Sequence, residues 1–274
     1  AHALERCGLA DVRRRVIRDL SKGFRQRVVD EDFRHVSLWL WERESGGTQR
    51  LTDGKTVFSY EWSPTGTHLA AGLAPHNLID DHYMFTRLHR IEPETGSVEL
   101  LVDNPGKLGA YAWSPDGKRL AYVSASDRND PHAGTLFLTD AKGGAPRALT
   151  SGFRGMVNDL AWASDEGLMC VISEGVRSSI VFIDTDSGEF QRPERTPKLA
   201  YSAVEMAGDT RAYVVASTPQ LPREVFRLSA DADTGINATL LTHSNSWLSD
   251  VALGKQYERL TSEYEADKSC RKAK

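Results

Sequence analysis

The sequence contains, at residues 111–122, the stretch Tyr111-Ala112-Trp113-Ser114-Pro115-Asp116-Gly117-Lys118-Arg119-Leu120-Ala121-Tyr122. The same pattern of an aromatic strand, a turn and a second apolar strand recurs at residues 60–71 and, more loosely, at residues 160–171. The tryptophans of these copies, Trp62, Trp113 and Trp162, are 51 and 49 residues apart. Self-similarity at a fixed period of this length is the signature of a repeat architecture.

A second marker keeps the same period. It consists of the pairs Leu51-Thr52, Leu101-Val102, Leu149-Thr150 and Leu241-Thr242, which are separated by 50, 48 and 92 residues. The last step is close to twice the period, and a weaker fourth copy at residues 201–215 fills the gap. Two independent markers with one period indicate a true repeat.

Each repeat predicts four short strands. In the second copy, a strand over residues 108–114 leads into the turn Pro115-Asp116-Gly117, and a return strand covers residues 119–124. Proline presets φ in such a turn, and glycine accepts the positive φ that the reversal needs. Two further strands, at residues 135–139 and up to Leu149, complete the unit. Four antiparallel strands in about 50 residues are typical of one β-propeller blade.

The sequence therefore predicts an all-β fold, a partial β-propeller of about four to five four-stranded antiparallel blades. The propeller segment is expected at residues 29–256, between short helical segments at residues 1–28 and 257–274. A β-sandwich is the alternative, but its strands do not repeat a tryptophan-turn signature every fourth strand. We expect the three tryptophans to pack between blades, in equivalent places near the start of each blade.

The run from Trp113 to Ala121 resembles the W-S-P-D-G-x-x-L-A signature of TolB-like propellers and of the propellers of prolyl-oligopeptidase-family serine peptidases. Flanking phrases at residues 80–88, 222–226, 241–248 and 252–256 are similar to the peptidase propellers in particular. The resemblance covers roughly residues 33–256. It implies half a blade at residues 33–52 and about four more, in a family whose complete propeller has seven blades and whose hydrolase domain follows the propeller.

The resemblance does not bring a catalytic site with it. A nucleophile elbow needs G-x-S-x-G, and this pentapeptide does not occur in the sequence, so no catalytic residue is assigned. The implied function is that of a non-catalytic propeller that gates the access of peptides to a hydrolase domain outside this chain. The alternative is a TolB-like propeller that binds proteins. Candidate substrate contacts are Asp80, Asp81 and His82, which are otherwise solvated charges of a loop.

The first 28 residues follow another pattern. Val12, Val16, Leu20 and Phe24 recur every four residues among arginines, which predicts a basic amphipathic helix. Residues 4–28 also resemble the signature region of an ABC-transporter ATPase, in which Ser21 and Gly23 match the serine and glycine that meet the γ-phosphate. A third possible function is thus an ATPase fragment.

A P-loop is missing from the pattern. Gly54-Lys55-Thr56 matches the end of this motif, but Gln49 stands where the motif requires glycine. We therefore read Asp53-Gly54 as a turn between blades and expect no nucleotide or other cofactor. Cys7, Cys170 and Cys270 show no metal-ligand spacing and are interpreted as free thiols, which favours a reducing compartment such as the cytoplasm.

Charge is distributed unevenly along the chain. The formal net charge of −4 divides into +5 for residues 1–28, −11 for residues 29–254 and +2 for residues 255–274. An acidic body argues against nucleic acid as the main partner, because neutralising phosphates requires clustered Lys and Arg. No apolar run is long enough for a membrane span. The expected partner is a peptide or a protein, and an open arc is also expected to self-associate unless residues 12–24 cover its end faces.

Overall fold

The computed structural model describes residues 34–128, 134–193, 197–208, 211–231 and 235–254. The two predicted terminal segments, with the ATPase-like Ser21 and Gly23 and with Cys7 and Cys270, lie outside these residues. Cys170 is described and is a buried free thiol, as predicted.

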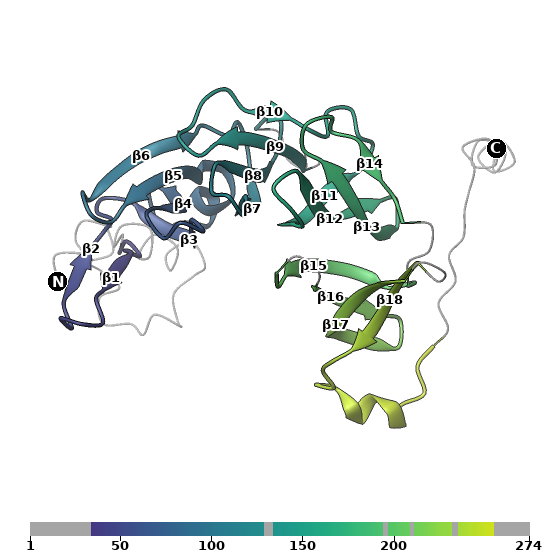
Figure 1. Cartoon of the computed structure of the whole chain (residues 1–274). Helices are drawn as coiled ribbons and strands as arrows, with labels where there is room; N and C mark the ends of the chain where they lie inside the picture. Colours follow the sequence, from purple (N-terminus) through teal and green to yellow (C-terminus); the bar gives the residue numbers. More distant parts are fainter. Residues whose placement is uncertain (1–33, 129–133, 194–196, 209–210, 232–234, 255–274) are drawn as a thin grey trace, which may run out of the picture.

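The described chain forms four four-stranded sheets and one two-stranded sheet, arranged along an open arc (Figure 1). We call the two-stranded sheet the half-blade and the others blades 1 to 4. The half-blade contains β1 (Trp39–Trp41) and β2 (Thr48–Arg50). Blade 1 contains β3 (Thr56–Trp62), β4 (Leu69–Ala74), β5 (Arg87–Glu92) and β6 (Ser97–Val102). Blade 2 contains β7 (Leu108–Trp113), β8 (Arg119–Ser124), β9 (Thr135–Asp140) and β10 (Arg147–Ala148). Blade 3 contains β11 (Met156–Trp162), β12 (Gly167–Glu174), β13 (Arg177–Asp184) and β14 (Phe190–Gln191). Blade 4 contains β15 (Ala200–Met206), β16 (Ala212–Thr218), β17 (Leu221–Asp231) and β18 (Gly235–Leu240).

Within every blade the strands pair antiparallel with their sequence neighbours. Two short helical turns, η3 (Asp81–Phe85) and η4 (Ser246–Asp250), interrupt the pattern. The predicted partial propeller of half a blade and four more blades is confirmed. None of the described helices is long and apolar enough to cross a membrane.

The tryptophan-turn motif ends the first strand of each of the first three blades. Trp62 pairs with Leu69, and Trp113 pairs with Leu120 in the same register. Gly66 and Gly117 have φ of 70° and 69°, the left-handed conformation that the turn requires. The third copy differs, because its loop is one residue shorter and Gly167 already opens β12 without a positive φ.

The Ser-Pro-Asp-Gly turn of blade 2 is held by its own side chains. The hydroxyl of Ser114 donates to Asp116 Oδ1 at 2.6 Å, and the backbone N–H of Lys118 donates to the same oxygen at 3.0 Å. These bonds, first that of Ser114, lower the pKa of Asp116 to about 2. Arg119 N in turn donates to Ser114 Oγ at 2.9 Å. This bond fixes the register in which β8 begins after the turn.

The Leu-Thr marker has a structural role at the end of the outermost strand. The hydroxyls of Thr52, Thr150 and Thr242 accept hydrogen bonds of 2.8–2.9 Å from the backbone N–H groups of residues 38, 136 and 225, which lie within or just before the neighbouring third strand. The preceding leucine N–H donates back to the carbonyl of the same third-strand residue. The marker therefore fastens the outer pair of strands of the half-blade, blade 2 and blade 4.

The core lies between blades, not within them. Leu88 and Leu101 of blade 1 pack with Trp113 and Tyr122 of blade 2. Equivalent apolar clusters join blade 2 to blade 3 and blade 3 to blade 4. Blades 1 to 3 are therefore stabilised by burying both faces against their neighbours.

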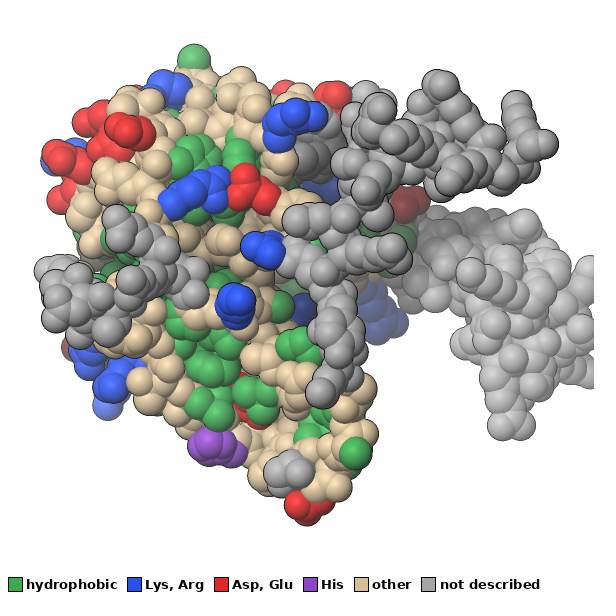
Figure 2. Space-filling model, turned by 90° about the vertical axis from the view of Figure 1, so that its right-hand side faces the viewer, with side chains coloured by type: hydrophobic (Ala, Val, Ile, Leu, Met, Phe, Trp, Pro, Cys, Tyr) green, Lys and Arg blue, Asp and Glu red, His purple; other side chains and the backbone are tan. Residues whose placement is uncertain are grey.

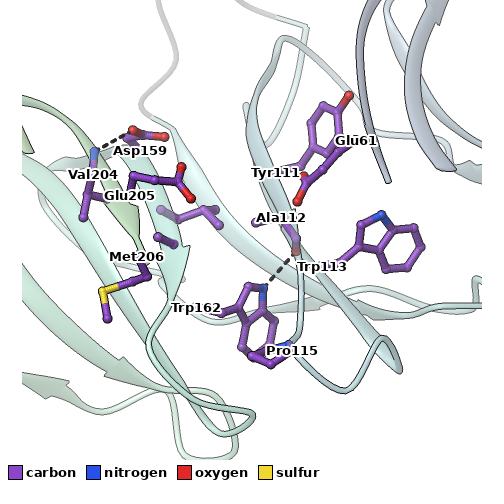
Figure 3. A pocket seen from close by; sticks show the side chains of 12 residues that line it. Glu61, Tyr111, Ala112, Trp113, Pro115, Asp159, Trp162, Val204, Glu205 and Met206 are labelled. Atoms are coloured by element: carbon purple, nitrogen blue, oxygen red, sulfur yellow. Dashed lines mark hydrogen bonds between the residues drawn. The ribbon is translucent and has the colours of Figure 1, made fainter. Parts of the chain in front are cut away.

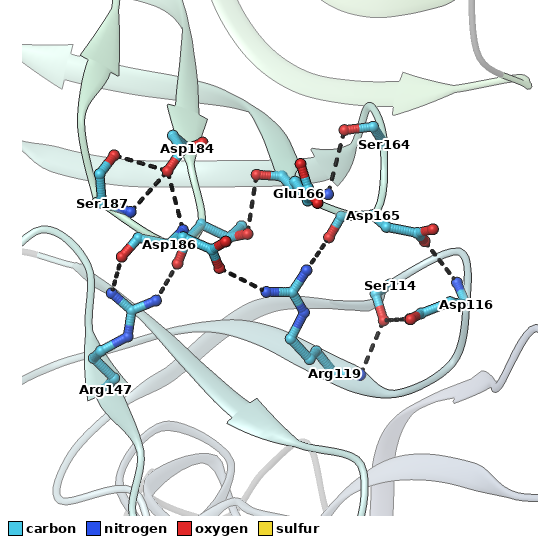
Figure 4. Close-up of polar contacts among 11 residues, drawn as sticks. Ser114, Asp116, Arg119, Arg147, Ser164, Asp165, Glu166, Asp184, Asp186 and Ser187 are labelled. Carbon is cyan, nitrogen blue, oxygen red and sulfur yellow. Dashed lines mark hydrogen bonds and ion pairs between the residues drawn. The ribbon is translucent and has the colours of Figure 1, made fainter.

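A polar network reinforces the junction between blades 2 and 3 (Figure 4). Arg119 Nη1 contacts Asp186 Oδ1 at 3.2 Å, and its guanidinium also donates to the carbonyl of Asp165. The backbone N–H of Asp116 donates to Asp165 Oδ1 at 2.9 Å, and Arg147 donates to the carbonyl of Asp186 at 2.9 Å. These contacts join the turn of blade 2 to two loops of blade 3.

The three tryptophans occupy equivalent places, as predicted, but they are not equally buried. Trp113 and Trp162 are 4% and 7% exposed, whereas Trp62 is 41% exposed. Trp113 and Trp162 each pack against the blade that precedes their own. Trp62 is more exposed because only the half-blade precedes blade 1.

Candidate functional site

The first strands of the four blades line a cavity of about 320 Å³, which we call the central cavity (Figure 3). β3 contributes Glu61, and β7 contributes Tyr111 and Trp113. β11 and β15 complete the wall with the side chains of Asp159, Leu160, Trp162, Val204, Glu205 and Met206. Residues from 61 to 206 meet here because each blade places its first strand on the inner side of the arc.

Glu61 stands directly before the blade tryptophan, so the alternation of the strand turns it away from Trp62 and into the cavity. Its carboxylate accepts a hydrogen bond from the backbone N–H of Trp113, which lowers its pKa. Burial has the larger effect and, together with the negative charge of Glu205, raises the pKa of Glu61 to about 7. Figure 3 shows Glu61 and Glu205 on opposite sides of the cavity.

Asp159 follows a β-bulge in β11, where the pairing with β12 shifts between Val157 and Asp159. Its Oδ2 accepts a hydrogen bond of 2.9 Å from Val204 N of the next blade. Burial raises the pKa of Asp159, although the hydrogen bonds from Val204 and Leu160 oppose this shift. Asp159 thus joins two blades and also adds a carboxylate to the cavity wall.

No described Lys or Arg forms an ion pair with any of these three carboxylates. Glu205 is exposed, but Glu61 and Asp159 are partly buried. Burying these two carboxylates without a cation is unfavourable, and an incoming ammonium or guanidinium group would relieve that cost. The cavity is therefore suited to a cationic group.

The aromatic part of the wall is fixed by hydrogen bonds between blades. The hydroxyl of Tyr111 donates to Ser59 Oγ at 2.9 Å, and Trp162 Nε1 donates to the carbonyl of Ala112 at 2.9 Å. Burial raises the pKa of Tyr111 to about 12, so this phenol remains a donor at neutral pH. Rigid aromatic faces of this kind are common contact surfaces for peptides.

The structure places the sequence-predicted contacts Asp80, Asp81 and His82 elsewhere, at η3 in the connection between β4 and β5. Asp81 is buried, and its Oδ2 accepts hydrogen bonds from the backbone N–H and Nδ1 of His76 at 2.8 and 2.9 Å. The ring of His82 packs edge-on against Phe58. None of the three lines the central cavity, and their contact with a substrate remains a prediction.

Glu61, Asp159 and Glu205 are functional candidates that the sequence motifs do not indicate. A signal was present, because Glu61 and Glu205 occupy the same repeat position, one residue before the blade marker Trp62 or its counterpart Met206. A charged residue on the first strand of a blade, which lies on the inner side of the arc, is a candidate functional residue. Asp159 gave no comparable signal, since its orientation depends on the bulge.

Metal-ligating side chains are scattered among the described residues. No group of three or more His, Cys, Asp or Glu side chains among them is arranged to hold a metal ion. Gly54 has a φ of 66°, which agrees with the predicted turn between the half-blade and blade 1.

No family model matches this sequence. Dipeptidyl-peptidase 5 of Aspergillus oryzae is 22% identical over 173 residues, which are 58% of this chain and 24% of that protein. The chain therefore spans about a quarter of the length of the curated relatives that it matches.

Solved structures resemble this chain in fold. TolB from Acinetobacter baumannii superposes with a TM-score of 0.54 and 15% identity, over 75% of this chain and 49% of that one. The β-propeller domain of the trilobed protease from Pyrococcus furiosus gives 0.51 and 15%, over 76% and 62%. A puromycin hydrolase gives 0.54 and 20%, over 74% and 32%. The fold is that of a β-propeller. The ATPase resemblance of residues 4–28 gains no support from these relatives.

Proposed function

We propose that this chain is the non-catalytic part of a propeller that receives peptides, and that the central cavity holds a cationic group of the peptide. The observation that carries the proposal is the convergence of Glu61, Asp159 and Glu205 on one cavity without a basic partner among the described residues. The fold shared with peptidase propellers supports a role beside a hydrolase domain, where the propeller gates the access of peptides.

The size of the cavity favours a peptide end or a single side chain. Its volume of about 320 Å³ is near the lower end of small-ligand sites, which span roughly 300–1,000 Å³. An amino-terminal ammonium or a lysine or arginine side chain fits this volume and the charge. Affinity for a lysine or arginine side chain is expected to increase from pH 6 to pH 8, because Glu61 loses its proton in this interval while these cations keep theirs.

The test is a fluorescence-anisotropy titration of the full chain with a short peptide that has a free amino terminus and one lysine. Its N-acetylated, lysine-free twin is the control peptide. We expect the cationic peptide to bind about tenfold more tightly, and Glu205→Gln to remove most of that difference. Glu99→Gln, at an exposed position on the outermost strand β6, is the control variant. Equal binding of the two peptides, or equal behaviour of the two variants, would refute the proposal.

A propeller that docks folded proteins, as a TolB-like module, is the second candidate. The likeness to TolB supports this second candidate to the same degree as the likeness to peptidase propellers supports the first. A further observation favours it, because hydrophobic side chains gather on the side of the molecule shown in Figure 2. At the blade 4 end, Leu221, Leu248, Val251 and Leu253 line a hollow of about 490 Å³. This candidate predicts no measurable affinity for short peptides.

A further inference from the structure

Five buried side-chain nitrogen or oxygen atoms have no hydrogen-bond partner among the described residues, and four of them lie at the junction between blades 1 and 2. These four, which we call the junction atoms, are His68 Nε2, Arg90 Nε, Trp113 Nε1 and Thr139 Oγ1. A buried polar atom without a partner is costly, and such atoms are rare in native proteins. The concentration of four at one junction therefore requires a physical cause.

The strand registers place the junction atoms on facing surfaces of the two blades. Arg90 lies directly opposite Ala70 in blade 1. Trp113 and Thr139 lie on either side of Leu120 in blade 2. Ala70 and Leu120 both belong to the apolar cluster between these blades, and directly opposite residues share one face of a sheet. Arg90, Trp113 and Thr139 therefore face the same junction.

His68 brings the fourth junction atom to this place. Its ring packs edge-on against the indole of Trp113, with 4.9 Å between the ring centroids. Burial, and then the positive charge of Arg90, lower the pKa of His68, so the ring is neutral at neutral pH. His68 and Trp113 are only 6% and 4% exposed. The junction atoms are therefore enclosed between the two blades.

A chain of hydroxyl groups determines which ring nitrogen of His68 carries the proton. The backbone N–H of His68 donates to Ser63 Oγ at 3.4 Å. Contacts of 3.0, 2.8 and 2.9 Å then lead from Ser63 through Thr65 and Thr67 to His68 Nδ1. When each hydroxyl donates to the next, every proton of this chain has an acceptor, whereas in the reverse direction the Ser63 proton has none among the described residues. Nδ1 is therefore the acceptor, and Nε2 carries an N–H that points to the junction.

The next junction of the arc shows the same donors with acceptors that the protein supplies. Trp162 Nε1 donates to the carbonyl of Ala112 at 2.9 Å, whereas its repeat counterpart Trp113 has no such bond. Arg119 occupies the repeat position of His68, and its guanidinium donates to two loops of blade 3. The junction of blades 1 and 2 thus presents donors to which no described residue offers an acceptor.

We propose that the junction between blades 1 and 2 binds a small monovalent anion, of the size of chloride, on the N–H groups of His68, Arg90 and Trp113. Arginine and tryptophan nitrogens can only donate, so the ligand must accept several hydrogen bonds. A water molecule fits less well, because it brings two protons of its own and only Thr139 Oγ1 among the junction atoms can accept one. Glu92 pairs with Arg90 Nη1 at 2.9 Å and offsets part of its charge, so one negative charge fits better than the two of a phosphate.

The probe is chloride, titrated from zero to ~150 mM against the full chain while gluconate keeps the ionic strength and the sodium concentration constant. Gluconate is too large for the enclosed junction. Nitrogen-15 NMR spectra of the tryptophan indole groups report the contact, and Trp113→Phe identifies the Trp113 resonance. We expect chloride to shift the Trp113 indole N–H resonance saturably. The Trp162 indole, which is already bonded to Ala112, is the internal control and should stay unchanged.

Variants assign the anion to this junction. Arg90→Gln removes both the Nε donor and its charge, and we expect it to weaken chloride binding at least about tenfold. Arg227→Gln, at an exposed position of β17, is the matched control and keeps the affinity. Glu205→Gln should also keep it, because the anion site does not rest on the cation-binding role proposed for the central cavity. Dispersed amide resonances verify that each variant is folded.

Thermal unfolding gives a second measurement that needs no assigned resonance. A ligand that binds only the folded chain stabilises it, so chloride should raise the Tm of the parent chain by about 2–4 °C relative to gluconate. Trp113→Phe should lose this gain, because it keeps an aromatic ring but removes the N–H donor. Trp39→Phe, at an exposed tryptophan, is the matched control and should keep the gain.

Three outcomes would overturn the proposal. A Trp113 indole resonance that is the same in chloride and in gluconate would assign the acceptor role to water. Equal shifts of the Trp113 and Trp162 resonances would show a general effect of salt. Unchanged chloride affinity in Arg90→Gln would place the anion elsewhere on the chain.

Discussion

At the scale of single residues, Glu61 makes the most distinctive prediction. The pKa of Glu61 is raised to about 7 in the native state, so this carboxyl disfavours the native state once it must ionise. The free energy of unfolding is therefore higher at low pH and decreases as pH rises from about 4.5 through 7. Glu61→Gln should therefore be more stable than the parent by about 1–3 kcal/mol at pH 8 and equal to it at pH 4. Urea denaturation at both pH values measures this. The exposed Glu94→Gln is the control, and a stability gain that is the same at both pH values would contradict the assignment.

Thr150 tests the second repeat marker. Its hydroxyl accepts the N–H of Leu136 at a buried position, so Thr150→Val leaves this donor without a partner. We expect a loss of about 1 kcal/mol in the free energy of unfolding. The same change at the exposed Thr239 of β18 should cost little. Equal effects at the two sites would show that the marker is not structural.

Single residues also show which features of the repeats and of the central cavity could not be predicted from the sequence. The leucine-threonine pairs could be recognised as a marker, but their role depends on hydrogen bonds across 14 to 17 residues. Glu61 and Glu205 could have been selected by aligning the repeats. Asp159 could not, because a bulge sets its direction. Asp80, Asp81 and His82 form a polar cluster in the sequence, and in the structure Asp81 holds its own loop through His76.

At the scale of elements, the turns after the first strands of blades 2 and 3 differ in the conformation of their glycine. Gly117 has a φ of 69°, whereas Gly167 has no positive φ. A Cβ at Gly117 would also approach Thr65 Cγ2 to 3.1 Å. Gly117→Ala should therefore cost about 1–2 kcal/mol, and Gly167→Ala should cost clearly less. Thermal unfolding of the two variants measures the difference, and similar losses would mean that the turns are equivalent.

The strands themselves were largely predictable. The hairpin at residues 108–124 and the strand at residues 135–139 were expected, and the structure places β7, β8 and β9 there within one residue. Turn chemistry and apolar strands carry this information locally. The shorter turn before β12 escaped prediction, because Ala163 and Ser164 close it through backbone contacts with Gly167.

At the scale of the whole molecule, the arc has an apolar end at blade 4. Beyond blade 4 no further blade exists among the described residues, and Leu253 and Val251 are exposed there. We expect the mass measured by light scattering to increase with concentration, and Leu253→Asp to reduce this increase. Val176→Asp, at a highly exposed loop position of blade 3, is the control. A monodisperse single-chain mass at all concentrations would contradict the expectation.

The number of blades followed from the period of the repeat, whereas the central cavity did not. Its walls come from residues 61 to 206, and their approach depends on the curvature of the arc. Curvature arises from the packing of neighbouring blades, through clusters such as that of Trp162 with Leu138 and Leu149. No local pattern in the sequence reports this packing.

The most direct test of the central cavity is a carbon-13 NMR titration of the glutamate and aspartate carboxyl groups, with and without a lysine-containing peptide. We predict that Glu61 titrates near pH 7 in the free chain, since it is partly buried and faces Glu205. Bound peptide should lower this pKa toward that of an ordinary glutamate, because an ammonium group stabilises the carboxylate. An ordinary pKa for Glu61 in the free chain, or a pKa that the peptide leaves unchanged, would contradict the assignment of the central cavity as a site for a cationic group.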